Sequence, residues 1–204
     1  MNQYTLLIIS YLVGAIPFGL LIGKAKGIDL RQHGSKNLGA TNAVRVLGKP
    51  LGIVVFILDF LKGASPIWVA SYVLDYNQNL IWIVCCGFFA IIGHVFPVYL
   101  KFKGGKGVAT SAGVLVGLAP TVLGISLLIW VLTFYTSRMV SLASILATLG
   151  AIFLQIYIAD KPFGHNLPVT SLLLLVGFII VWRHRTNILR IIQGQENRFE
   201  KKDN

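Results

Sequence analysis

The chain has 204 residues, of which 55% are hydrophobic and only 12% are charged. Its mean hydropathy of +0.76 excludes a soluble globular protein, because so few polar side chains could not cover the surface of one. The net charge of +11 favours anionic over cationic ligands. Together these values predict an integral membrane protein built from α-helices.

Apolar runs predict seven transmembrane helices in chain order, because about 20 helical residues cross the hydrocarbon core of a bilayer. They lie near residues 4–23, 51–74, 80–100, 108–119, 121–135, 139–159 and 167–182. The fourth and fifth come from one long apolar run, which Gly117, Pro120 and Gly124 interrupt as a tight hairpin would require. No linker divides the chain, so we expect a single membrane domain over residues 1–204.

The basic residues favour seven spans over six, because cytoplasmic loops retain Lys and Arg. Seven spans with the N-terminus outside and the C-terminus cytoplasmic leave only Lys161 outside, whereas six spans would move Arg138 and the C-terminal basic residues outside. The seven-span topology brings three polar segments, residues 24–50, 101–107 and 183–196, to the cytoplasmic side. We therefore expect these segments to build one site there.

The segment KFKGGKGVAT, residues 101–110, combines three lysines with three glycines at a membrane boundary. Glycines let a backbone approach an anion closely and present N–H groups to it, while lysines supply positive charge, so the segment predicts a phosphate site. It is not a nucleotide-binding P-loop, because Gly107 follows Lys106 where that motif needs Ser or Thr. Alternatively, Lys101 and Lys103 only anchor the flanking spans at the interface.

The first cytoplasmic segment contains HGSKNLGATNAVR, which ends at Arg45. One interpretation is that its small polar side chains cap a helix that starts near Asn42. The other is that a helix N-terminus, amide groups and the Arg45 guanidinium surround a phosphate.

In the third segment, WRHRTNILRIIQGQE, the spacing of Arg183, Asn187 and Arg190 predicts that they share one face of a continuing helix. Arginines just inside a span often only fix topology, which is the alternative interpretation for Arg185, Arg190 and Arg198. That interpretation does not explain His184, Asn187 or Glu196.

Two charged residues interrupt the second apolar run. Asp59 and Lys62 are three positions apart, so we expect them to form a structural ion pair on one helix face. His94, late in the third run, either lines the site or bonds a neighbouring backbone group, and we expect the second. The adjacent Cys85 and Cys86 are expected to be buried without a disulfide.

Three motifs together resemble the bacterial acyl-phosphate-dependent glycerol-3-phosphate acyltransferases, over nearly the whole chain. They are GSKNLGATN with Arg45, GHVFPVYLKFKGGKGVAT, and WRHRTNILR with GQE. The resemblance implies acyl transfer from acyl phosphate to glycerol 3-phosphate, giving lysophosphatidic acid and phosphate, the first acylation of phospholipid synthesis. It implies no metal or cofactor, a bacterial cytoplasmic (inner) membrane location with the active site facing the cytoplasm, and an upstream soluble enzyme that makes acyl phosphate.

Site residues carried over from the family motifs fall into two groups. The catalytic group is Ser35, Lys106, His184 and Asn187, and the substrate-binding group is Asn37, Thr41, Asn42, Arg45, Gly104, Gly105, Gly107, Ser141, Arg183 and Glu196. His184 is either the general base or a phosphate ligand, with the substrate's own phosphate taking the proton. Lys36 departs from the family pattern, which commonly has glycine there; a left-handed backbone would be strained at a lysine.

Two observations separate the resemblance from other classes. No histidine is followed by Asp in an HxxxxD pattern, so the His/Asp dyad of other glycerolipid acyltransferases is absent. A transporter of a small phosphorylated anion would also use a basic site between helices, but few polar groups lie within the spans or outside to form a second gate. A structural partner that organises lipid-synthesis enzymes is a third class, in which Lys106 and Arg45 would be dispensable.

Overall fold

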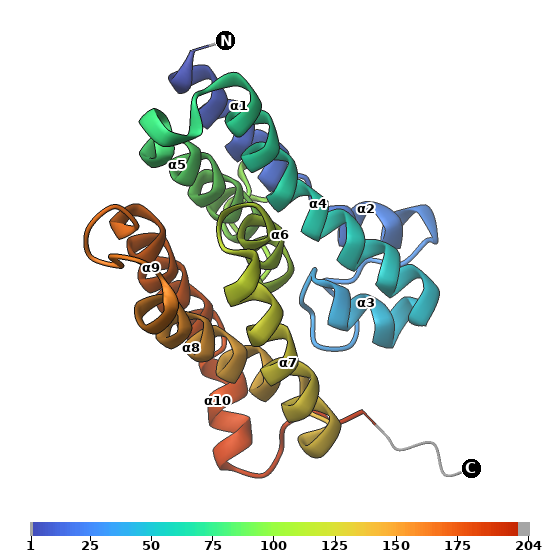
Figure 1. The fold of residues 1–204 in the computed structure, drawn as a ribbon. Helices are drawn as coiled ribbons and strands as arrows, with labels where there is room; N and C mark the ends of the chain where they lie inside the picture. The colour runs from blue at the N-terminus through green and yellow to red at the C-terminus, as the bar shows by residue number, and fades with distance from the viewer. Residues whose placement is uncertain (1, 200–204) are drawn as a thin grey trace. The chain divides into compact units, whose positions relative to one another are not determined.

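The computed structural model describes residues 2–199, and every regular element in that range is helical (Figure 1). The chain divides into two compact units, Met1–Leu118 and Ala119–Asn204. The predicted all-α class is confirmed. Within these residues, five helical stretches are long and apolar enough to cross a membrane, and a pair of helices bent by 57° would make a sixth if it counts as one span.

The first unit contains six α-helices and a short 3-10 helix within residues 2–118. They are α1 (Gln3–Ala15), α2 (Phe18–Ala25), α3 (Ala40–Leu47), α4 (Lys49–Val73), α5 (Tyr76–Val95), η1 (Val98–Leu100) and α6 (Val108–Leu118). Helix α1 packs along α5, and α4 packs along both α6 and α3. The predicted first span is broken at Pro17, which precedes α2 and cannot continue the hydrogen-bond ladder of α1.

Small residues allow the membrane helices of this unit to touch at backbone distance. A Cβ at Gly14 would overlap the backbone of Ala90, and one at Gly113 would overlap the carbonyl of Phe60. Such contacts are typical of membrane helix pairs, where van der Waals packing rather than the hydrophobic effect drives association. They fix α1 against α5 and α6 against α4.

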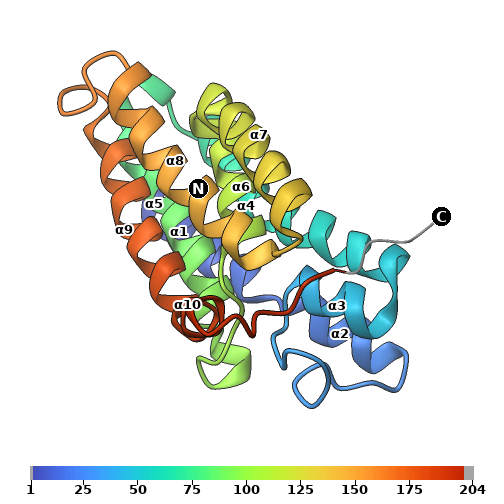
Figure 2. The ribbon, with the colours of Figure 1, turned by 90° about the horizontal axis from the view of Figure 1, so that it is seen from below.

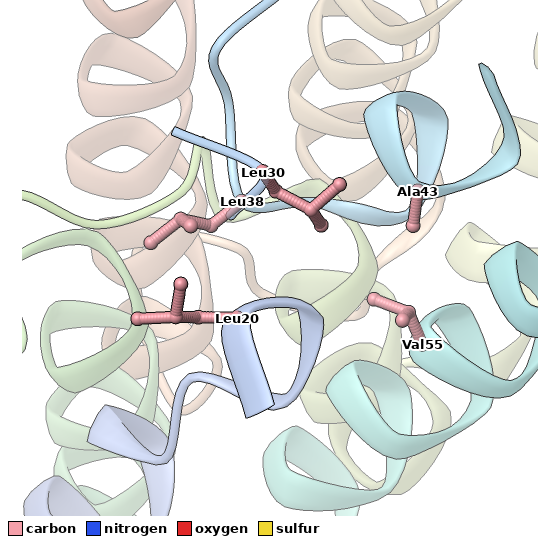
Figure 3. Close-up of a cluster of buried hydrophobic side chains, with 5 residues drawn as sticks. All are labelled: Leu20, Leu30, Leu38, Ala43 and Val55. Atoms are coloured by element: carbon pink, nitrogen blue, oxygen red, sulfur yellow. The ribbon is translucent and has the colours of Figure 1, made fainter. Parts of the chain in front are cut away.

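The first polar segment is folded against the end of this bundle. Its apolar side chains Leu30 and Leu38 are buried with Leu20 of α2, Ala43 of α3 and Val55 of α4 (Figure 3). Leu30 is fully buried, so the segment is a packed element and not a loose connection. The polar residues of the motif are thereby held in place by a small hydrophobic core of their own.

The second unit consists of α7 (Pro120–Ser137), α8 (Val140–Ile158), α9 (Leu167–Arg183) and α10 (Arg185–Ile192), within residues 119–199. Helix α7 packs along α8, and α9 packs on the opposite part of the α8 surface (Figure 2). The indole Nε1 of Trp130 donates to Ser144 Oγ at 3.2 Å, which ties α7 to α8.

The chain turns between α9 and α10 by 57° at His184. The prediction that Arg183, Asn187 and Arg190 share one face of a continuing helix is therefore wrong. Arg183 ends α9, whereas Asn187 and Arg190 lie three positions apart on α10. The break reorients the polar face of the segment after the membrane helix has ended.

Helix α6 has 11 residues, fewer than a full bilayer crossing needs. The break between α6 and α7 falls at Ala119, followed by Pro120 at the first position of α7, as the predicted hairpin requires. All seven predicted apolar segments are helical, but within residues 2–199 only five helical stretches are long and apolar enough to be candidate spans by themselves. The count of seven spans stays a prediction.

Candidate active site

Asn42 organises the polar loop between α2 and α3. Its Oδ1 accepts the N–H of Ser35 at 2.8 Å, and its Nδ2 donates to the carbonyls of Leu30, His33 and Asn37. The side chain is 1% exposed, and these bonds occupy its donor and acceptor atoms. Asn42 therefore shapes the loop, and its predicted direct contact with substrate has no support from this geometry.

Of the two interpretations of the first segment, the one in which a polar side chain caps the helix near Asn42 is wrong. Helix α3 begins at Ala40 with Gly39 as its N-cap, which has no side chain to offer. Asn37 acts before the helix, where its Oδ1 accepts the N–H of Gly39 at 2.8 Å in a local turn. Thr41 lies in the first turn of α3 and Arg45 in the last, and both are half-buried.

Lys36 has a left-handed backbone, with φ of +57°. The concern raised by its departure from the family glycine is confirmed, because this conformation is costly for a residue with a Cβ. The exposed Ser35 hydroxyl precedes it. The loop presents Ser35 and Lys36 outward while Asn42 holds their backbone from within.

The glycine loop, residues 104–107, lies on the end of α5. Gly104 N–H donates to the Val95 carbonyl and Gly105 N–H to the His94 carbonyl, both at 3.1 Å. A Cβ at Gly105 would overlap the His94 imidazole. These two glycines therefore serve close packing, and their amides fix the loop to α5 instead of forming the anion-binding nest expected from the sequence.

Gly107 and Lys106 complete this loop. Gly107 has φ of +93°, a conformation that only glycine adopts readily, and it leads directly into α6 at Val108. Lys106 is half-buried, whereas Lys101 and Lys103 are exposed. Of the three lysines, Lys106 is thus the one held within the folded loop.

The predicted ion pair in α4 is confirmed: Lys62 Nζ is 2.8 Å from Asp59 Oδ1, and both side chains are almost fully buried. Lys62 also donates to the Ile16 carbonyl at 2.8 Å. The His94 imidazole faces a charged side chain, because its Nδ1 lies 3.7 Å from Asp59 Oδ1. The three side chains line a small recess.

That recess joins two of the motifs within the first unit. Its walls include Leu38 of the first polar loop and Gly104 and Gly105 of the glycine loop. The rest of the wall is formed by Ala15, the Ile16–Gly19 break, Pro97 and the three polar side chains. Motifs more than 60 residues apart in sequence, by the difference between 104 and 38, thus meet around one recess.

The carboxylate of Glu196 accepts hydrogen bonds from three side chains of the second unit. Its Oε1 accepts from Ser141 Oγ at 2.8 Å and Asn187 Nδ2 at 2.7 Å, and its Oε2 accepts from Arg190 Nε at 2.8 Å. Burial by itself raises the pKa of this carboxyl, but the hydrogen bonds from Asn187, Ser141 and Arg190 outweigh it and hold the pKa below the ordinary value. Glu196 is therefore ionised at neutral pH.

Three of the predicted site residues, Ser141, Asn187 and Glu196, are brought together in this cluster. Arg190, for which fixing the topology was the alternative interpretation, belongs to the cluster as well. Its spacing of three residues from Asn187 on a helix was the available signal. The segment that carries Glu196 is held in turn by a hydrogen bond from Phe199 N–H to the Arg138 carbonyl.

His184 sits at the junction of α9 and α10 and is 3% exposed. Its Nδ1 lies 2.8 Å from the Ile180 carbonyl, which can only accept, so the neutral imidazole carries its proton on Nδ1. Nε2 is then the nitrogen able to accept a proton or a hydrogen bond. Arg183, one residue earlier, is half-buried, with its guanidinium 5.9 Å from the Trp182 ring centroid.

A family model described as glycerol-3-phosphate acyltransferase matches residues 4–194, across both units and all three motifs. The chain belongs to this family. Among relatives named glycerol-3-phosphate acyltransferase, that of Aquifex aeolicus is 45% identical over 98% of this chain and 100% of its own length. The acyltransferase of Desulfotalea psychrophila is 46% identical over 96% of this chain and 97% of its own length.

The acyltransferase fold is also similar to solved structures of PlsY (YgiH), an integral membrane glycerol 3-phosphate acyltransferase. The glycerol 3-phosphate form is 43% identical, with a TM-score of 0.89 over 97% of this chain and 96% of that one. The lysophosphatidic acid form is 42% identical, with a TM-score of 0.86 over 97% and 95%. Membership in a family of integral membrane acyltransferases is therefore established.

Proposed function

We propose that this acyltransferase takes its acyl group from acyl phosphate and transfers it to glycerol 3-phosphate. The observation that carries the acceptor is the likeness to PlsY in glycerol 3-phosphate and lysophosphatidic acid forms, which are acceptor and product of such a transfer. The donor rests on the three motifs and on the absence of an HxxxxD dyad. An acyl phosphate is activated enough to react without a covalent acyl-enzyme.

The proposed reaction is a direct displacement. The glycerol hydroxyl oxygen bonds to the acyl carbon, the bond from that carbon to the phosphate oxygen breaks, and inorganic phosphate leaves. Lys106 stabilises the negative charge that develops on the carbonyl oxygen or leaving phosphate, an effect of about 3 kcal/mol per well-placed donor. Arg45, Ser35 and Arg183 bind the anionic groups of the substrates, and Thr41 and Asn37 are further substrate-binding residues.

The hydroxyl proton passes either to His184 or to the phosphate of glycerol 3-phosphate. With its proton on Nδ1, the neutral imidazole of His184 offers Nε2 as the acceptor that a general base needs. To bind the phosphate instead, Nε2 must carry a second proton, because phosphate oxygens accept hydrogen bonds. A His184→Gln variant separates them. Retained kcat with a raised KM would assign the proton to the substrate phosphate, whereas a loss of kcat would assign it to His184.

We further infer that Asn42, Gly104, Gly105 and Gly107 act by shaping the two loops of the first unit. Asn42, Gly104 and Gly105 form hydrogen bonds to other groups of this unit, and Gly107 supplies a positive φ. Glu196, Ser141 and Asn187 act together in the second unit, where Glu196 orients the other two. The family model spans both units, which supports a single catalytic domain over residues 1–204.

The decisive experiment supplies purified protein with palmitoyl phosphate and glycerol 3-phosphate. We expect release of phosphate and lysophosphatidic acid in equal amounts, and no product from acyl-CoA or acyl carrier protein. Product from acyl-CoA at a comparable rate would overturn the proposed donor. A soluble enzyme that makes acyl phosphate would then have no role as the upstream partner.

The membrane topology proposed for this enzyme has seven spans, with the N-terminus outside and the three motifs on the cytoplasmic side of the bacterial inner membrane. The distribution of Lys and Arg supports it. With Cys85 and Cys86 replaced by Ala, a membrane-impermeant thiol reagent should label Phe163→Cys in intact cells. Gln32→Cys should react only after permeabilisation. The reverse pattern would contradict the proposed orientation.

A further inference from the structure

A buried pair of charges lies behind the glycine loop. Asp59 is 2% and Lys62 3% exposed, within a helix long and apolar enough to span a membrane. Ionised side chains at such positions are expensive, and neutral residues of similar size often give equal or greater stability. Stability alone therefore does not explain why the chain carries this pair.

The contacts of the pair lead out of α4 to two other elements. Lys62 donates to the Ile16 carbonyl, at the break between α1 and α2, while Asp59 faces His94 near the end of α5. The ammonium group of Lys62 also lies 5.6 Å from the ring centroid of Phe18. The pair thus ties the α1–α2 break and the end of α5 to one point on α4.

His94 connects the Asp59–Lys62 pair to the glycine loop. Its carbonyl accepts the Gly105 N–H at 3.1 Å, and its imidazole fills the space that a Cβ at Gly105 would need. Lys106 is the next residue along the chain. A rotation of His94 away from Asp59 would therefore displace the backbone immediately before Lys106.

We propose that Asp59, Lys62 and His94 are positioning residues that hold the glycine loop in the conformation from which Lys106 acts. The role of Lys106 rests on the proposed function, whereas the coupling of the three side chains to the loop conformation does not. The network acts through the loop and requires no contact with substrate.

The principal test is the double variant Asp59→Asn/Lys62→Met, which removes both charges and keeps similar side-chain volumes. In detergent we expect an unfolding temperature close to wild type, because a buried pair is replaced by neutral groups. Hydrogen exchange in a peptide over residues 96–108 should accelerate about tenfold, with peptides from α8 and α9 unchanged. We expect kcat to fall about 10- to 100-fold, as for a small misplacement of a catalytic group.

Two further variants keep the test decisive if the double variant does not fold. His94→Leu removes the imidazole but leaves both charges paired, and it should show the same faster exchange and lower kcat with KM changed less. Lys62→Arg keeps a cation that can donate to both Asp59 and the Ile16 carbonyl, so this variant should retain most of the wild-type kcat. Ser10→Ala, a buried change in α1 whose hydroxyl hydrogen-bonds with the Leu6 carbonyl and the Cys86 thiol, is the matched control.

Unchanged exchange in residues 96–108 together with unchanged kcat in the double variant would overturn the proposal. A lower unfolding temperature with normal kcat in the folded enzyme would also overturn it, because that pattern indicates a purely structural pair. If wild type does not use palmitoyl phosphate, the proposed function fails while the exchange measurement still decides whether the network holds the loop.

Discussion

The two units use their motif residues in different ways. In the first unit, Asn42 and the glycines at 104 and 105 bond mainly to backbone, so the motif builds and packs two loops. In the second unit, Ser141, Asn187 and Arg190 all converge on the carboxylate of Glu196, so the motif is a network of side chains. Residues of the family motifs thus fix the conformation of loops in the first unit, whereas in the second unit they orient one another's side chains.

The difference follows from which polar groups of each segment need hydrogen-bond partners. A polar loop that leaves helices has many unpaired backbone groups, and Asn and Gly are suited to satisfy or tighten them. A buried ionised carboxylate instead needs several hydrogen-bond donors around its two oxygens, which side chains from neighbouring helices can supply. The four predictions below test this contrast, beginning with the largest effect.

Lys106→Ala should cause the greatest loss, a fall in kcat/KM of about 100- to 1,000-fold, since the proposed role of Lys106 is to stabilise developing negative charge. The matched control is Lys103→Ala, an exposed lysine of the same segment, which should stay within about threefold of wild type. Rates of phosphate release from palmitoyl phosphate give both values. Equal losses in the two variants would mean that only the general positive charge of the segment matters.

Gly105→Ala tests whether the first unit depends on loop packing. The added Cβ would overlap the His94 imidazole, so the loop must shift, and we expect kcat to fall about tenfold or more. Gly124→Ala is the control, because a Cβ at Gly124 meets no atom within 4 Å. The comparison is measured on detergent-purified protein of matched unfolding temperature. Full activity in Gly105→Ala would remove the argument for close packing of this loop.

The pH dependence of stability tests the network in the second unit. The folded-state pKa of Glu196 lies below its ordinary value of 4.5, so its ionisation stabilises the fold above that pH. This contribution is lost as the pH falls through the lowered folded-state pKa. Between pH 6 and pH 3 the unfolding temperature of wild type should therefore drop further than that of Glu196→Gln.

The size of that difference follows from the hydrogen bonds at stake. Bonds to a charged group contribute about 1.5–3 kcal/mol, which corresponds to about 3–12 °C in a chain of this size. Glu196→Gln itself should lower the unfolding temperature at neutral pH, because its amide N–H would face the Arg190 donor. Parallel pH curves for the two proteins would show that Glu196 does not stabilise the second unit by its charge.

Lys36→Gly should have the smallest effect. Glycine relieves a left-handed backbone conformation that costs about 1–2 kcal/mol at a lysine, but it also loses about 0.4–1 kcal/mol through greater freedom of the unfolded chain. We expect a net stabilisation of about 1 kcal/mol or less, seen as a rise of a few degrees in unfolding temperature. Lys36→Ala is the control and should bring no such gain.

Local pattern sufficed for much of this protein. Hydropathy predicted the helical membrane class, and the apolar runs marked every long helix to within a few residues, because burial in lipid leaves few alternatives to a helix. The spacing of Asp59 and Lys62 was enough to predict their ion pair. The motifs themselves were sufficient to assign the family, which the match over residues 4–194 confirms.

Only the tertiary structure decided what each motif residue does. The Ser141–Glu196 hydrogen bond joins residues 55 positions apart, and the Asp59–His94 contact joins residues 35 positions apart. The bend at His184 depends on where helix α9 ends. Periodicity reports which face of a helix is apolar, but it carries no information about which distant side chain lies opposite. The sequence by itself determined the helices and the family. Packing determined that Gly104 and Gly105 lie directly against His94 and that Glu196 accepts a hydrogen bond from Asn187.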